Sequence, residues 1–136
     1  VSVENFLLGQ MKPGQLNTTI LRFGGLIDEQ RHPAKYLSGR KGLTESEAPV
    51  NLIHKQDCVG IISKIINEKK WGEVYNGVSD EHSSRYEFYT KACDKRGLPR
   101  PEFSDRGVYK NYKEISNQKI RQVLKYNLLF PKLIQF

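Results

Sequence analysis

The sequence predicts an α/β fold with a few, mostly parallel strands and about four helices, and three observations indicate this. Short β-branched or apolar segments alternate along the chain with segments of helical periodicity. Glycine or proline follows most of the helical segments. The chain has 136 residues and is 38% apolar, which suffices for one domain with its own core. Strands that alternate with helices imply parallel pairing through right-handed crossovers.

The first elements are expected between residues 18 and 54. Residues 18–25, "TTILRFGG", are predicted to form a buried strand that ends in a glycine pair. Pro33 suits the start of a short helix, which Gly39 and Gly42 end. Residues 48–54, "APVNLIH", form a short extended segment that leads to the next helix.

The clearest amphipathic helix is expected to begin after Asp57, which is a plausible N-cap. Apolar residues then recur at the helical spacing i, i+3, i+4, i+7 and i+8, at Cys58, Ile61, Ile62, Ile65 and Ile66. A strand is predicted at 73–78, "EVYNGV", with Gly77 near its end.

A further helix is expected within 83–97. Ser84 and Glu87 have the spacing of a capping box, Gly97 closes the helix, and the prolines that follow prevent its continuation.

The last third is less regular. Residues 112–116, "YKEIS", are predicted to form a short strand, and Ser116 to cap a last helix whose apolar face includes Ile120 and Leu124. The tail, 128–136, is apolar and expected to be extended. Only two central strands are convincing, and two parallel strands need neighbours and cover on both faces. We therefore expect them to be the last strands of a larger sheet.

Composition limits the function classes. The formal net charge is +7, with the basic residues scattered, so nucleic-acid binding is permitted but only weakly indicated. Cys58 and Cys93 fall on apolar helical faces, and without a C-x-x-C pair they indicate neither a disulfide framework nor a metal site. No apolar run is long enough for a membrane span, and residues 1–14 lack a signal-peptide pattern, so a cytoplasmic location is expected. The absent initiator Met suggests that the chain begins part-way through a longer product.

A strand that ends in Gly24-Gly25 lets another group approach its backbone closely. From the residues alone, a bound ligand and a plain turn that needs positive φ explain the pair equally well.

Four segments in order, 18–32, 48–66, 72–89 and 112–124, resemble the C-terminal half of an extended short-chain dehydrogenase/reductase of the NAD-dependent epimerase/dehydratase family. The resemblance spans about 17–130. It implies a Rossmann-type fold whose nucleotide-binding half is absent from residues 1–136, which form a single substrate-side region. It also implies two groups of site residues: Phe23, Gly24 and Gly25 beside the nicotinamide of NAD or NADP, and Arg31, Arg40, Asn51 and His54 in the substrate region.

Two positions depart from that family. Nucleotide-sugar epimerases commonly have an arginine for the diphosphate four positions before His54, where this chain has Val50. The loop after the first strand usually reads Tyr-Gly-Pro-Gly, and here it is "IDEQ", 27–30.

The parts that carry the family's chemistry are missing from these residues. No G-x-G-x-x-G occurs, although the family binds the cofactor pyrophosphate there. Tyr109 and Lys113 have the Tyr-x-x-x-Lys spacing of the catalytic pair, but they follow the substrate-region strand instead of preceding Arg22. We therefore assign no catalytic residue and expect the chain alone to bind no cofactor. The missing half would be roughly 150 residues, at about 30 per βαβ unit, either cut away or never encoded.

The sequence thus favours the substrate-side part of an NAD(P)-dependent epimerase or dehydratase, with a small, possibly sugar-nucleotide-like substrate in the full-length family. A basic nucleic-acid-binding module that uses "KNYK", 110–113, is one alternative, although the aromatic residues at 86, 88 and 89 follow a helix face and argue against it. A self-associating interaction module is another. An unpaired sheet edge predicts a homo-oligomer in any case.

Overall fold

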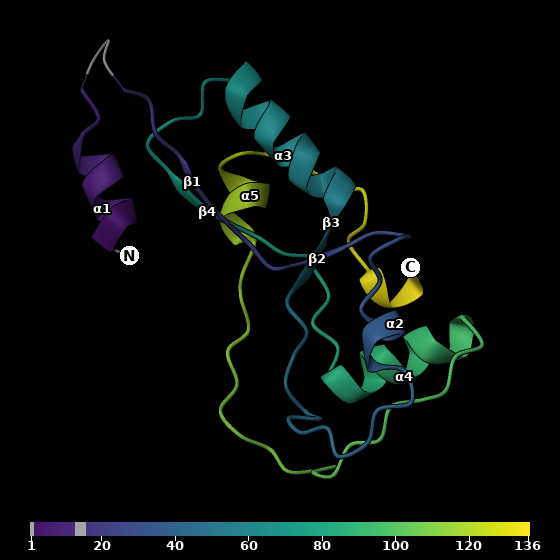
Figure 1. The fold of residues 1–136 in the computed structure, drawn as a ribbon. Coiled ribbons are helices and arrows are strands. Elements are labelled where there is room, and N and C mark those ends of the chain that lie inside the picture. Colours follow the sequence, from purple (N-terminus) through teal and green to yellow (C-terminus); the bar gives the residue numbers. More distant parts are fainter. Residues whose placement is uncertain (1, 13–15) are drawn as a thin grey trace.

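The computed structural model describes residues 2–12 and 16–136 of the chain. It confirms an α/β fold with few, parallel strands (Figure 1). In chain order the elements are α1 (Ser2–Gly9), β1 (Ile20–Phe23), β2 (Gly25–Ile27), α2 (Ala34–Leu37), β3 (Leu52–His54), α3 (Lys55–Asn67), β4 (Val74–Gly77), α4 (Arg85–Lys95), α5 (Gln118–Gln122) and the 3-10 helix η1 (Leu133–Gln135).

The predicted strand at 18–25 is in fact two strands that pair with different partners. β1 runs parallel to β4, and β2 runs parallel to β3. The change of partner falls at the glycine pair, because the Gly24 amide donates to the carbonyl of Gly77 and the Gly25 amide to the carbonyl of Asn51. The two small sheets therefore meet at Gly24, which lies between β1 and β2 in the chain; Figure 1 shows these strands.

The main core lies where α3 and α5 pack on these strands. Its buried members are Ile53, Cys58, Ile61, Ile65, Tyr75, Ile120 and Leu124. A second cluster joins β2 to α4 and η1 through Ile27, Val50, Phe88 and Leu133. Cys58 and Cys93 are buried free thiols, as expected for small apolar side chains.

The prediction that Asp57 caps α3 is wrong. The helix begins at Lys55, and the N-cap is His54, whose ring accepts a hydrogen bond from the Gln56 amide. Asp57 lies one turn in and is fully buried. Its carboxylate accepts bonds from the Tyr126 hydroxyl at 3.1 Å, the Leu129 amide at 2.7 Å and the Phe130 amide at 3.0 Å. It holds the C-terminal segment on the core.

The predicted strand at 112–116 is also wrong. That segment has no ladder partner among the described residues. The side chain of Asn51 binds it instead, donating to the Lys113 carbonyl at 3.1 Å and accepting from the Ile115 amide at 2.9 Å. Asn117, and not Ser116, is the N-cap of the short α5, although Ser116 accepts a bond from the Gln118 amide.

The ends of the chain differ from expectation as well. The tail is not extended throughout, because residues Leu133–Gln135 form η1. The helix α1 had no clear sequence signal. It buries none of its residues and is tied to β1 by a bidentate ion pair between Glu4 and Arg22.

The cap of α4 is as predicted, since the Ser84 hydroxyl accepts from the Glu87 amide, and Gly97 closes the helix with a φ of 62°. No helix within the described ranges is long and apolar enough to cross a bilayer.

Candidate functional site

Other parts of the chain pack so closely against Gly24 and Gly25 that neither position has room for a side chain. A Cβ atom on Gly24 would lie 2.4 Å from the carbonyl oxygen of Asn51 and 2.9 Å from the side chain of Val78. A Cβ on Gly25 would lie 2.7 Å from the Leu52 side chain. Neither glycine has a positive φ. The structure therefore does not support a turn that needs positive φ at this pair. The contact of these residues with a nicotinamide stays a prediction.

Phe23 ends β1 and turns its ring toward the neighbouring strand. A Cβ on Gly77 would lie 2.4 Å from the ring, so β4 needs a glycine there. The ring also packs on the main core. The side chain of Phe23 therefore contributes to packing, and the predicted contact of Phe23 with a nicotinamide stays a prediction.

A polar cleft lies at the carboxyl ends of β2 and β3. Its volume is about 280 Å³. Ligands of open α/β sheets bind at this end of the strands. The lining comes from two segments, the loop after β2 with Asp28, Glu29 and Gln30, and the junction of β3 with α3 at His54, Lys55 and Gln56.

His54 is the buried member of this lining, with 5% of its surface exposed. Its ring stacks on Phe130 at 3.7 Å between centroids and meets Phe136 edge-on at 4.8 Å. Burial lowers the pKa of His54, which favours the neutral form of the ring. Because Nδ1 accepts from the Gln56 amide at 3.2 Å, the proton sits on Nε2. The described residues give that Nε2 no hydrogen-bond partner.

Most charged side chains in and beside the cleft bind other groups of the protein. The Asp28 carboxylate accepts from the amides of Arg31 at 2.6 Å and Gln30 at 2.9 Å, and these bonds hold the pKa of Asp28 below its usual value. The Lys55 ammonium lies 3.5 Å from the same carboxylate. Lys35 approaches from α2 and donates to two carbonyls of the loop, at 2.9 and 3.3 Å.

The structure does not gather the predicted substrate-region residues in one place. His54 lines the polar cleft, whereas Arg31 lines a neighbouring cavity of about 400 Å³ with Leu26, Pro33 and Tyr36. Arg40 lies in a loop where its carbonyl accepts from the Glu102 amide at 2.8 Å. Asn51 binds the 113–115 segment. Sequence reasoning missed Glu29, Lys55 and Gln56, although the position of Lys55 and Gln56 directly after the extended segment 48–54 was an available signal.

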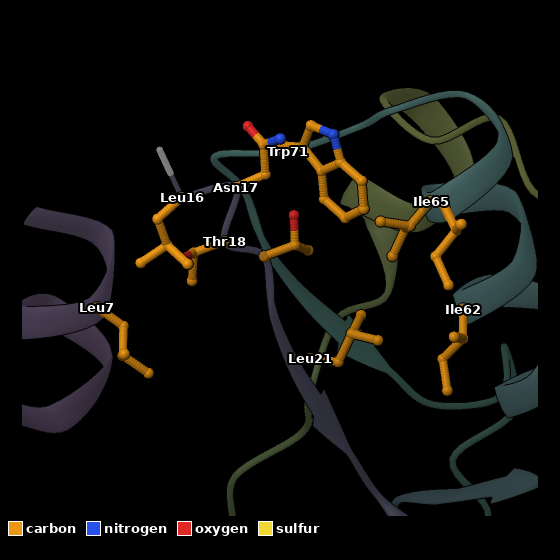
Figure 2. A pocket seen from close by; sticks show the side chains of 10 residues that line it. Leu7, Leu16, Asn17, Thr18, Leu21, Ile62, Ile65 and Trp71 are labelled. Atoms are coloured by element: carbon orange, nitrogen blue, oxygen red, sulfur yellow. The ribbon is translucent and has the colours of Figure 1, made fainter. Parts of the chain in front are cut away.

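An apolar groove lies beside β1, between α1 and α3 (Figure 2). Its volume is about 330 Å³. Figure 2 shows Leu7 from α1 on one side, Leu21 between, and Ile62 and Ile65 from α3 on the other, with Trp71 above. The outer face of α3 continues the apolar surface, with Val59, Ile62 and Ile66 exposed by 58, 41 and 55%.

The chain resembles known proteins in both sequence and fold. No family model matches the sequence. Protein YeeZ of Escherichia coli K12 is 31% identical over 112 residues, which are 82% of this chain and 40% of YeeZ. The UDP-glucose 4-epimerase of Thermotoga maritima, solved with UDP-glucose, matches 94% of this chain and 46% of its own, with a TM-score of 0.75 at 15% identity.

The dTDP-glucose 4,6-dehydratase of Bacillus anthracis, solved with NAD, matches 98% of this chain and 47% of its own, with a TM-score of 0.72 at 18% identity. The chain thus spans about half the length of these structures and less than half of the curated relative. Its described residues have the fold of the C-terminal half of an NAD-dependent epimerase/dehydratase of the extended short-chain dehydrogenase/reductase type.

Proposed function

We propose that this chain is the substrate-side part of an NAD(P)-dependent oxidoreductase related to nucleoside-diphosphate-sugar epimerases and dehydratases. The observation that carries the proposal is the match of nearly the whole chain to one half of such enzymes. The polar cleft supports it, because it lies at the strand ends where α/β enzymes bind ligands.

The residues of the chain fit the nicotinamide end of a dinucleotide, but not its pyrophosphate. The backbone at 23–25 ends a parallel strand, where a nicotinamide could lie. A pyrophosphate needs a glycine-rich turn that leads into a helix N-terminus. Among the described residues, the one long helix that directly follows a strand is α3, which begins at Lys55 and is already capped by the ring of His54. NAD or NADP would therefore depend on residues outside this chain.

We expect the purified 136-residue chain to show no NADH or NADPH oxidation with sugar or carbonyl substrates. The reason is the absence of a pyrophosphate cradle and of a helical Tyr/Lys pair from its sequence. Absorbance of the reduced cofactor measures this, with a complete NADPH-dependent carbonyl reductase and its substrate as the positive control. Sustained turnover by the purified chain, or micromolar cofactor binding by calorimetry, would refute the proposal.

We also propose that the chain forms a homo-oligomer through the apolar groove and the edge of β1. The amides of Ile20 and Gly24 bond to the β4 side. Residues of a parallel strand alternate in direction, so Leu21 and Phe23 present their amides to the other edge, where no described strand pairs. An unpaired edge beside exposed isoleucines is a template for association.

Replacing Ile66 with Lys is expected to weaken self-association about tenfold or more, because it puts a charge in the apolar contact. Ile66 is 55% exposed, so the chain should still fold. Val108→Lys is the matched control, since Val108 is 48% exposed in a loop that does not line the groove. Sedimentation equilibrium measures the difference. A folded monomer at high concentration, or equal effects of the two variants, would argue against this interface.

A further inference from the structure

We propose that two buried histidines, His32 and His54, form an acid-sensitive latch that holds the segment 129–136 on the core through the ring of Phe136. His32 lies in the loop between β2 and α2, and His54 lies at the junction of β3 and α3. Two parts of the chain that are distant in sequence thus reach the same aromatic ring. The proposal concerns the fold of this chain and does not depend on the proposed function.

The ring of Phe136 pairs with both imidazoles. Its centroid lies 6.0 Å from that of His32, with the planes within 20°, and 4.8 Å from that of His54, at an interplanar angle of 67°. Each histidine makes one further stack, His32 on Phe88 of α4 at 6.1 Å and His54 on Phe130 at 3.7 Å. The two imidazoles therefore join α4 and the start of α3 to the segment 129–136.

Both imidazoles are held in the same protonation state. His32 and His54 are 0 and 5% exposed. In each ring Nδ1 accepts from the amide two residues later, that of Ala34 or Gln56, at 3.2 Å. Because an amide N–H only donates, Nδ1 is unprotonated while the latch is closed. A proton added there would place two donors against each other and a charge in a site that is closed to water.

The charges around His32 add to the cost of protonating it. Arg96 and Lys95 of α4 and Lys35 of α2 act on the ring, and burial together with these three cations lowers the pKa of His32 to about 4. Burial is the largest of these effects. Arg96 and Lys95 also donate to the last two backbone carbonyls of the segment. Holding the segment in place therefore keeps these cations close to the imidazole.

The charges around His54 are of both signs: the carboxylates of Asp57, Asp28 and Glu29 and the ammonium of Lys55. The carboxylates raise the pKa of His54, but burial has the larger effect and lowers it. The stacked rings of Phe130 and Phe136 supply part of that burial. Departure of the segment would uncover His54 and leave the carboxylates to favour its charged form.

The direction of the pH effect follows from these differences. Once the segment leaves, each histidine regains an ordinary pKa of about 6.5, so the released form binds protons more tightly than the latched form. The latch is therefore at full strength above about pH 6.5 and weakens as the pH falls toward the lowered pKa of His32, about 4. For His32 alone, the ratio of released to latched chain should rise about tenfold or more between about pH 7.5 and pH 5.

Release would also change the surface of the protein. Leu133 of η1 belongs to the second apolar cluster, so its departure uncovers Ile27, Val50 and Phe88. Acid would therefore expose an apolar surface between β2 and α4.

The first test measures the same linkage from the histidine side, since coupling between two events is reciprocal. Replacing Phe136 with Ala removes the shared ring, and NMR titration of the histidine ring carbons in the labelled 136-residue chain gives the pKa of His32 and His54. Both pKa values should rise toward about 6.5. Phe6→Ala is the matched control, because Phe6 is 63% exposed on α1, and it should change neither value. If either pKa were unchanged in Phe136→Ala, the proposal would be overturned.

The second test follows the segment itself by ¹⁹F NMR of the chain made with 4-fluorophenylalanine. Between about pH 7.5 and pH 4.5, the Phe136 signal should move toward its position in the unfolded chain, while the signal of Phe23 in the main core stays in place. The double variant His32→Asn/His54→Asn should lose this response, because asparagine can cap a helix and does not titrate. His82→Asn, which replaces the one other histidine in the sequence, should keep it.

The double variant separates the histidines from the Asp57 carboxylate, which also binds this segment. A Phe136 signal that moved only together with the Phe23 signal, or a response that survived in the double variant, would overturn the latch.

Discussion

Replacing Asp57 with Ala is expected to lower the free energy of unfolding by about 3 kcal/mol or more. The carboxylate is fully buried and accepts three hydrogen bonds, from Tyr126, Leu129 and Phe130. Its removal leaves three donors in part-buried surroundings without a partner in the chain, and an unsatisfied donor that is shielded from water costs about 1–3 kcal/mol. The hydrogen bond between Tyr126 and Asp57 also requires a glycine at position 60, because a Cβ there would lie 2.1 Å from the Tyr126 hydroxyl oxygen.

Urea unfolding followed by circular dichroism measures the loss. Asp94→Ala is the matched control, because Asp94 makes two short hydrogen bonds to Arg100, at 2.6 and 2.8 Å, on the surface. An exposed pair of that kind contributes about 1 kcal/mol or less. If Asp57→Ala cost no more than Asp94→Ala, Asp57 would not be the anchor of the C-terminal segment.

Replacing Gly24 with Ala is expected to destabilise the chain by about 3 kcal/mol or more, since overpacking against backbone leaves little room to relax. The new methyl group would lie 2.4 Å from the Asn51 carbonyl oxygen, which is backbone that cannot rotate away. Relief requires β1 and β2 to move away from β3, and this breaks the bond from the Gly25 amide to Asn51.

Gly9→Ala is the control for this prediction. Gly9 ends α1, and a Cβ there would meet nothing within 4 Å. Its unfolding free energy should therefore stay close to that of the parent. Near-equal stability of the two variants would mean that the two small sheets do not meet at Gly24 as described.

Local patterns in the sequence were sufficient for the elements that depend on periodicity. The isoleucines of α3, the strand at 74–77 and the Ser84 cap of α4 are found where their spacing predicted them. The break between β1 and β2 could not be predicted in this way, because it arises from a change of partner strand. The strand predicted at 112–116 is wrong for a similar reason, because this segment binds the side chain of Asn51 and not a neighbouring strand.

The site was less predictable than the fold. Asp57 has the residue type and position of an N-cap, but His54 lies three residues earlier and caps the helix first. The buried Asp57 carboxylate instead binds the C-terminal segment, through the Leu129 amide among others. The local sequence around Asp57 does not reveal this distant partner. Glu29 was visible only as a departure from the family's loop pattern, because its role depends on β2 and β3 ending side by side.

We infer that this chain forms one side of a larger sheet, whose other strands lie along the edge of β1 at which no described strand pairs. Hydrogen exchange at the amides of Leu21 and Phe23 tests it most directly, in the chain alone at concentrations where it is monomeric and in a chimera where it replaces the matching segment of YeeZ. We predict rapid exchange of both amides in the chain and strong protection in the chimera, because a neighbouring strand then binds them. Equally rapid exchange in a folded chimera, or protection already in the monomeric chain, would contradict the claim.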